Sequence, residues 1–99
     1  MTPELAARLA ALGIELAAEG KAYSMFTRGN CLALVQHSQA VYTGIGSSGI
    51  VTESGVAYLV WRDERPVLVG KGLELPADAA QVESLRHFSA DLKAALGLA

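Results

Sequence analysis

The first twenty residues carry a helical pattern of apolar positions. Thr2 is suited to the N-cap, and Pro3 takes the first helical position, where no intrahelical N–H bond is required. Four leucines follow at spacings of three or four and form one stripe, namely Leu5, Leu9, Leu12 and Leu16. Gly13 interrupts this stripe, and an interior glycine costs about 1 kcal/mol relative to alanine. The helix therefore either continues through Gly13 or ends there, with residues 14–18 extended.

Between residues 21 and 70 the pattern changes to short runs rich in Val, Tyr, Leu and Phe, separated by turn-forming residues. Connections this short join antiparallel neighbours, because parallel strands require longer crossovers. The sequence therefore predicts an antiparallel meander of about five strands. The predicted strands are residues 22–27, 31–36, 41–45, 56–62 and 66–70, with a short additional one at 50–52.

A second helix is predicted near the C-terminus. Residues 72–76 are expected to form a loop, and Asp78 and Gln81 have the spacing of a capping box. An apolar stripe follows at helical spacing, formed by Val82, Leu85, Phe88 or Ser89, Leu92 and Leu96. Gly97 suits the C-terminal cap.

These elements predict a single α+β domain over residues 1–99, with an N-terminal helix, an antiparallel β-meander and a C-terminal helix. This order is loosely similar to that of profilin-like domains. It resembles roadblock-type regulators less closely, because those place a further helix where this chain has glycine-rich turns. Topology alone does not fix function, so the resemblance implies no activity.

Composition narrows the class of protein. The 99 residues are 52% hydrophobic and 18% charged, which is typical of a folded chain. The net charge of −2 and the absence of a basic run argue against nucleic acid or an anionic membrane as partner.

The single cysteine, Cys31, has no partner for an internal disulfide, and the first residues lack the pattern of a signal peptide. No apolar run approaches the ~20 residues of a membrane span. We therefore expect a cytoplasmic protein.

The predicted strands are apolar on both sides, and no Asp, Glu, Lys or Arg occurs between Arg28 and Glu53. In residues 56–61, the side chains that point to one face of the sheet and those that point to the other are both apolar. We therefore expect both faces to be covered. Two short helices would cover a five-stranded sheet incompletely, which favours a homodimer with Tyr42, Tyr58 and Trp61 as candidate contacts. The alternative is a monomer that packs one helix on each face.

One glycine-rich segment matches the literal pattern G-x-G-x-x-G of dinucleotide-binding folds, with Gly44, Gly46 and Gly49 at the fixed positions. That fold needs a helix directly after the glycines, whereas the β-branched residues 50–52 follow here. A bulged turn is therefore predicted. An alternative is that the turn binds an anion or a phosphate through its N–H groups and hydroxyls, with Gly44, Gly46, Ser47, Ser48 and Gly49 as ligands.

No catalytic or metal-binding set is predicted. Cys31 and His37 share one strand and lie about 20 Å apart at the usual rise, so they form no dyad. His87 stands one helical turn after Glu83, the spacing of a surface pair. We therefore expect a non-catalytic interaction or regulatory module that self-associates and carries no metal or cofactor. A small-ligand binding protein is the alternative, and an enzyme is the third possibility.

Overall fold

The computed structural model describes residues 1–39, 41–53 and 55–98. One helix precedes and one follows an antiparallel sheet, in which each of the seven strands pairs with the next one in the chain. The α+β class, the two helices and the antiparallel meander are confirmed, while the strand number exceeds the expected five. The elements are α1 (Pro3–Ala11), β1 (Glu15–Glu19), β2 (Tyr23–Arg28), β3 (Cys31–Ser38), β4 (Val41–Thr52), β5 (Gly55–Arg62), β6 (Arg65–Gly70), β7 (Leu73–Pro76) and α2 (Ala79–Leu96).

The first additional strand, β1, forms because α1 stops before Gly13. Gly13 has a φ of +71°, which glycine adopts without strain. Its N–H donates to the carbonyl of Ala10 at 3.0 Å, and the N–H of Ile14 donates to that of Leu9 at 2.9 Å. This is a Schellman end, in which Ile14 also packs with Leu9 in the core. Of the two predicted alternatives, the shorter helix followed by an extended segment is therefore correct.

The predicted turn within residues 44–49 is wrong, because the whole segment belongs to strand β4. The first part of β4 pairs with β3 and its last part with β5. Two register shifts against β3 accommodate the extra residues as bulges, which bend a strand without ending it. Gly49 lies where β4 joins both neighbours, opposite Leu32 on one side and Tyr58 on the other.

The second additional strand, β7, replaces the loop predicted at residues 72–76. Leu73 pairs with Gly70 and Leu75 with Leu68, so β7 forms the edge of the sheet next to β6. Pro76 stands at the end of this edge strand, a position that proline tolerates because it has no N–H to contribute to the ladder.

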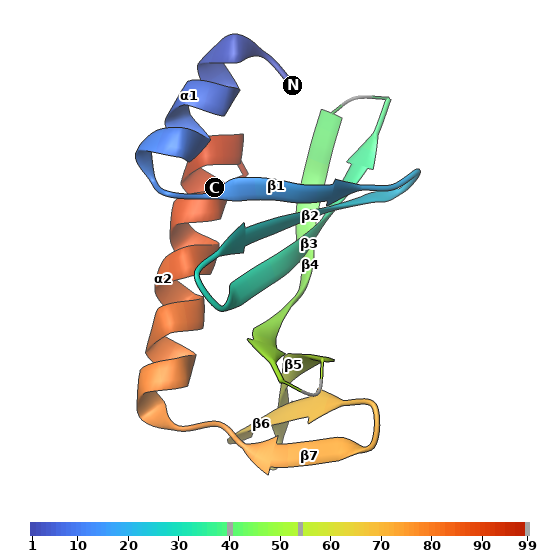
Figure 1. The fold of residues 1–99 in the computed structure, drawn as a ribbon, viewed down its shortest axis with the longest axis vertical. Coiled ribbons are helices and arrows are strands. Elements are labelled where there is room, and N and C mark those ends of the chain that lie inside the picture. Colours follow the sequence, from blue (N-terminus) through green and yellow to red (C-terminus); the bar gives the residue numbers. More distant parts are fainter. Residues whose placement is uncertain (40, 54, 99) are drawn as a thin grey trace.

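Both helices pack on the same face of the sheet. Figure 1 shows α2 running along the molecule, with α1 beside its C-terminal half and β5 to β7 near its N-terminal end. The capping box of Asp78 and Gln81 and the C-terminal cap at Gly97 are confirmed. Of the two candidates in the stripe of α2, Phe88 rather than Ser89 is buried. The core joins both helices to β2 and β3 and comprises Leu9, Ile14, Phe26, Ala33, Val35, Phe88, Leu92 and Ala95.

Candidate functional site

The sheet face opposite the helices is apolar. Phe26, Ala33 and Val35 point to the helices, so their neighbours along β2 and β3 point away from them. The strand register continues this side across β5 and β6. Leu32 is fully buried and the other members are half-buried. We call this surface the helix-free face; its residues are Met25, Leu32, Leu34, Tyr58, Val60, Val67 and Val69.

The structure does not bring the three aromatic interface candidates together. Tyr58 lies on the helix-free face, whereas Trp61, an odd number of residues later on β5, points to the helix side and is 58% exposed. Tyr42 also points to the helix side, where its ring meets Phe26 edge to face with centroids 5.6 Å apart. The register shift between Gln36 and His37 places the side chain of Tyr42 there.

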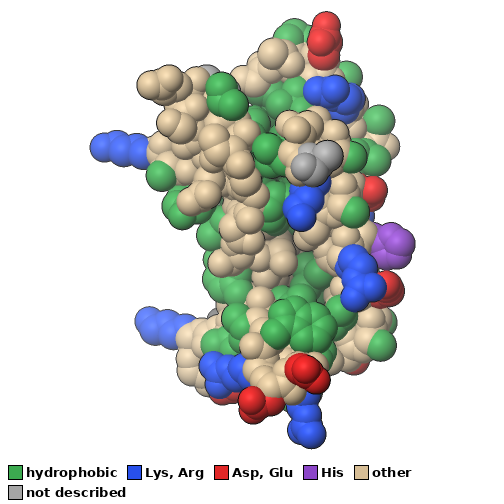
Figure 2. Space-filling model, turned by 180° about the vertical axis from the view of Figure 1, so that it is seen from behind, with side chains coloured by type: hydrophobic (Ala, Val, Ile, Leu, Met, Phe, Trp, Pro, Cys, Tyr) green, Lys and Arg blue, Asp and Glu red, His purple; other side chains and the backbone are tan. Residues whose placement is uncertain are grey.

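Trp61 borders a small groove of about 190 Å³ between α2 and the sheet. Leu59 and Ser48 contribute from the strands, and the helix contributes Val82, Leu85, Arg86 and Ser89. On the side seen in Figure 2, hydrophobic side chains gather in a hollow at the middle of the molecule, and most charged side chains lie around it. Leu59 and Trp61 are two residues apart on one strand, so the sequence predicts that they point to the same face of the sheet. Their contact with α2 depends on the path of the helix and is not predicted by this spacing.

A larger groove of about 860 Å³ lies between α2 and the turn that joins β2 to β3. We call it the α2 groove; its lining residues include Arg28, Asn30, Cys31, Ile50, Asp78, Gln81, Glu83, Ser84 and His87. Sequence reasoning did not foresee that Cys31 and His87 line one groove. The pKa of the Cys31 thiol is raised by burial, an effect that the nearby Arg28 cation partly opposes. Because the thiolate is the nucleophilic form, Cys31 is poorly suited to covalent catalysis at neutral pH.

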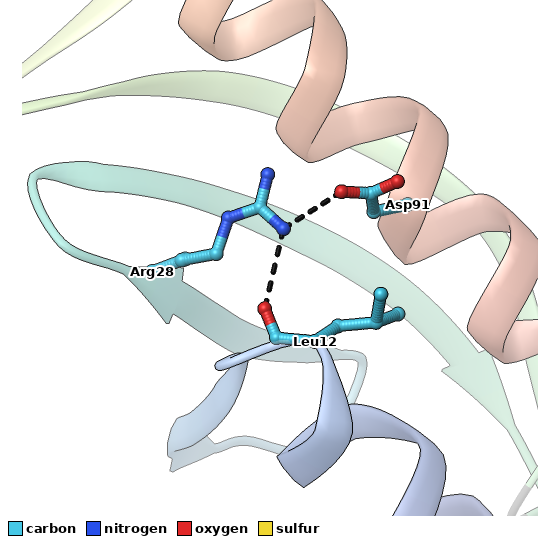
Figure 3. Close-up of polar contacts among 3 residues, drawn as sticks. All are labelled: Leu12, Arg28 and Asp91. Atoms are coloured by element: carbon cyan, nitrogen blue, oxygen red, sulfur yellow. Dashed lines mark hydrogen bonds and ion pairs between the residues drawn. The ribbon is translucent and has the colours of Figure 1, made fainter.

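Arg28 connects three elements at the end of this groove (Figure 3). Its Nη1 donates to the Asp91 carboxylate of α2 at 2.7 Å and to the Leu12 carbonyl, which follows α1, at 3.3 Å. The guanidinium carbon also lies 5.5 Å from the centre of the Phe88 ring, within the range of a cation–π contact. The side chain is only 29% exposed, so these contacts hold it in one place.

The proposed anion ligands of the glycine-rich segment lie along an extended, bulged strand. Gly44 pairs with Gln36, Ser48 with Ala33, and Gly49 with Leu32 of β3. Successive N–H groups of a strand point toward opposite edges, whereas an anion-binding nest needs consecutive N–H groups that converge. The segment therefore lacks the turn from which the anion-binding alternative at Gly44, Gly46, Ser47, Ser48 and Gly49 was predicted.

His37 and the remaining titratable groups form no assembled centre. The His37 Nε2 atom lies 3.0 Å from the Gly20 carbonyl, at the opposite end of β3 from Cys31. Within residues 1–39, 41–53 and 55–98, no three His, Cys, Asp or Glu side chains are grouped as metal ligands. Neither helix in this part of the chain has the length and apolarity needed to cross a membrane.

Comparison with protein-family models, with curated proteins and with solved structures finds no match to this chain.

Proposed function

We propose that this protein is a self-associating interaction module in which the helix-free faces of two copies pack against each other. The observation that carries the proposal is the apolar character of that face: seven apolar side chains from four strands lie side by side, and the charged Arg62 and Glu74 lie at its margin. Among the described residues, both helices pack on the opposite side. The six half-buried members of the helix-free face leave part of their apolar surface in contact with solvent, and contiguous exposed apolar patches commonly mark association sites.

A two-fold arrangement suits such a surface. In a symmetric dimer the same patch serves both copies, so an apolar face is complementary to itself without any matching of charge. The ion pair of Arg62 and Glu74, 2.6 Å apart, lies on the same side of the sheet, with Arg62 at the end of β5 and Glu74 on the edge strand β7 opposite Val69. It would form part of a polar rim around the contact.

The proposed role is binding rather than catalysis, in the cytoplasm. The raised pKa of the Cys31 thiol favours its unreactive form, and an unpaired cysteine suits a reducing compartment. The similarity to profilin-like domains remains a prediction about the order of the elements.

Two aromatic residues of β5 provide matched variants to locate the contact. We expect Tyr58→Lys to convert the dimer into a monomer, because it places a charge in the middle of the apolar contact at a cost of several kcal/mol. Trp61→Lys, on the other side of the sheet, should leave the mass at twice 10.3 kDa. Sedimentation equilibrium measures both masses, and circular dichroism verifies that each variant is folded.

A second variant keeps the test decisive if Tyr58→Lys fails to fold. Leu34→Lys lies on the helix-free face in β3, away from the junction of β4 and β5. It is expected to give a folded monomer as well. A dimer that persists in folded Leu34→Lys, or that dissociates in Trp61→Lys alone, would place the contact elsewhere and refute the proposed interface.

A further inference from the structure

The α2 groove is lined by Arg28, whose Nε–Nη2 edge makes no hydrogen bond to the described residues. Both hydrogen bonds of the Arg28 guanidinium end on Nη1 (Figure 3). Among the described residues, neither its Nε nor its Nη2 donates a hydrogen bond. These two nitrogens form the edge that binds the two oxygens of a carboxylate in parallel. Arg28 therefore offers a bidentate site while its other nitrogen remains bound to Asp91 and Leu12.

This arginine is already held in position. Contacts with Asp91, with the Leu12 carbonyl and with the Phe88 ring fix the guanidinium from three directions. An immobilised side chain loses little conformational entropy when a ligand arrives, so more of the interaction energy remains as affinity. Surface arginines lack this advantage because they must be ordered on binding.

The rest of the groove can receive an organic body. Half-buried Cys31 and Ile50 provide apolar surface, while Asn30 and Ser84 provide neutral hydrogen-bonding groups. The volume of about 860 Å³ falls within the range of small-molecule sites. The groove is therefore larger than a simple ion needs.

The charges along the groove differ between its ends. Arg28 lies near Asp91 of α2, whereas Glu83 and Asp78 line the groove closer to the start of that helix. Glu83 stands eight residues before Asp91, which corresponds to about 12 Å along a helix axis. Glu83 also pairs with Arg86 of the same helix at 3.4 Å, an exposed and weak ion pair that the ammonium group of a ligand can replace. A ligand that carries several negative charges would be repelled by the carboxylates along the groove. A ligand with an anionic group at one end and a cationic group at the other would match both ends of the groove, the anion at Arg28 and the cation at Glu83.

We propose that the α2 groove binds a short zwitterionic peptide, with its C-terminal carboxylate on the Nε–Nη2 edge of Arg28 and its ammonium group toward Glu83. Three extended residues span about 10 Å, and the flexible side chain of Glu83 can cover the rest of the distance of about 12 Å along the helix axis. The groove lies on the helix side of the sheet, so this site is independent of the proposed dimer contact.

Titration of the ¹⁵N-labelled protein with trialanine, followed by NMR, tests the proposal directly. Trialanine with free termini is expected to shift the amide signals of Asn30, Cys31, Ser84 and His87, with a Kd on the order of 1 mM. Trialanine amide lacks the carboxylate and should leave these signals unchanged. N-acetyl-trialanine lacks the ammonium group and should bind more weakly, and inorganic phosphate should not compete.

Three results would overturn the proposal. They are unchanged groove signals with trialanine at about 20 mM, equal shifts with the amide, and displacement of trialanine by phosphate at equal concentration. The first two would exclude carboxylate recognition, and the third would indicate a general anion site.

A pair of glutamate variants tests the cationic end without disturbing the Arg28 contacts. We expect Glu83→Gln to weaken trialanine binding several-fold while leaving the affinity for N-acetyl-trialanine unchanged. Glu64→Gln, at the β5–β6 turn outside the groove, should change neither affinity. Equal affinities of the Glu83→Gln and Glu64→Gln proteins for trialanine would contradict the assignment of the ammonium group.

Discussion

Replacement of Gly49 by alanine is expected to lower the free energy of unfolding by about 3 kcal/mol or more. Gly49 pairs with Leu32 of β3 and with Tyr58 of β5, at the point where β4 joins the two parts of the sheet. A Cβ atom at this position would lie 2.3 Å from the Ala57 carbonyl oxygen and 2.9 Å from the Tyr58 Cα. These atoms belong to the backbone, so a side-chain rotation cannot relieve the clash. Urea denaturation followed by circular dichroism measures the loss.

Gly44→Ala is the matched control for this substitution. Gly44 lies in the same strand, and neither glycine has a positive φ. The nearest atom to a Cβ at Gly44 is the Gln36 Oε1, at 3.9 Å, which is an ordinary contact. We therefore expect Gly44→Ala to change stability by less than about 1 kcal/mol. Similar losses in the two variants would show that the close approach of β5 to Gly49 does not explain the effect.

Phe88→Ala is expected to lower the free energy of unfolding by about 3 to 5 kcal/mol. Phe88 is fully buried in α2, and its neighbours in the core come from both helices and from β2 and β3. Removal of the ring leaves a cavity and also removes the surface on which the Arg28 guanidinium lies. The same denaturation experiment measures this loss.

Trp61→Ala provides the comparison, because it removes a larger side chain that is 58% exposed. Its loss should be clearly smaller, at about 2 kcal/mol, since more than half of the side chain remains in contact with water in the folded protein. A loss for Trp61→Ala that equals that for Phe88→Ala would mean that the core is not centred on α2, β2 and β3 as described.

Local signals explain what the sequence predicted correctly. The capping box of Asp78 and Gln81 and the glycine cap at Gly97 depend on neighbouring residues alone, and each appears as expected. The same is true of the Thr2 N-cap of α1, whose hydroxyl accepts a hydrogen bond from the Leu5 N–H at 3.1 Å. Helix ends are therefore the best-predicted features of this chain.

Features that depend on distant partners were missed. Leu16 continues the helical spacing of α1, but the Schellman end at Gly13 and pairing with β2 place it in a strand. The segment of β7 has no strong strand signal of its own and is defined by its pairing with β6. In β4, bulges allow the glycine-rich residues to remain in the sheet, and they turn Tyr42 to the other face.

The candidate sites also divide into features that local sequence predicts and features that depend on distant residues. Alternation along β5 correctly placed Tyr58 and Trp61 on opposite sides, and the uncovered face was foreseen as one of two arrangements. The α2 groove combines Arg28 from β2 with Ser84 and His87 from a helix more than fifty residues away. The spacing of these residues in the sequence does not predict that they lie close together, because their proximity results from the path of α2 across the sheet.

The solution mass of the unmodified protein is the most direct test of the central claim. Light scattering over a wide concentration range is expected to give a mass of twice 10.3 kDa that persists on dilution. Such a result would agree with two copies that cover each other's helix-free faces. A mass of 10.3 kDa at every concentration would contradict the account, because the apolar face would then remain uncovered in the absence of another partner.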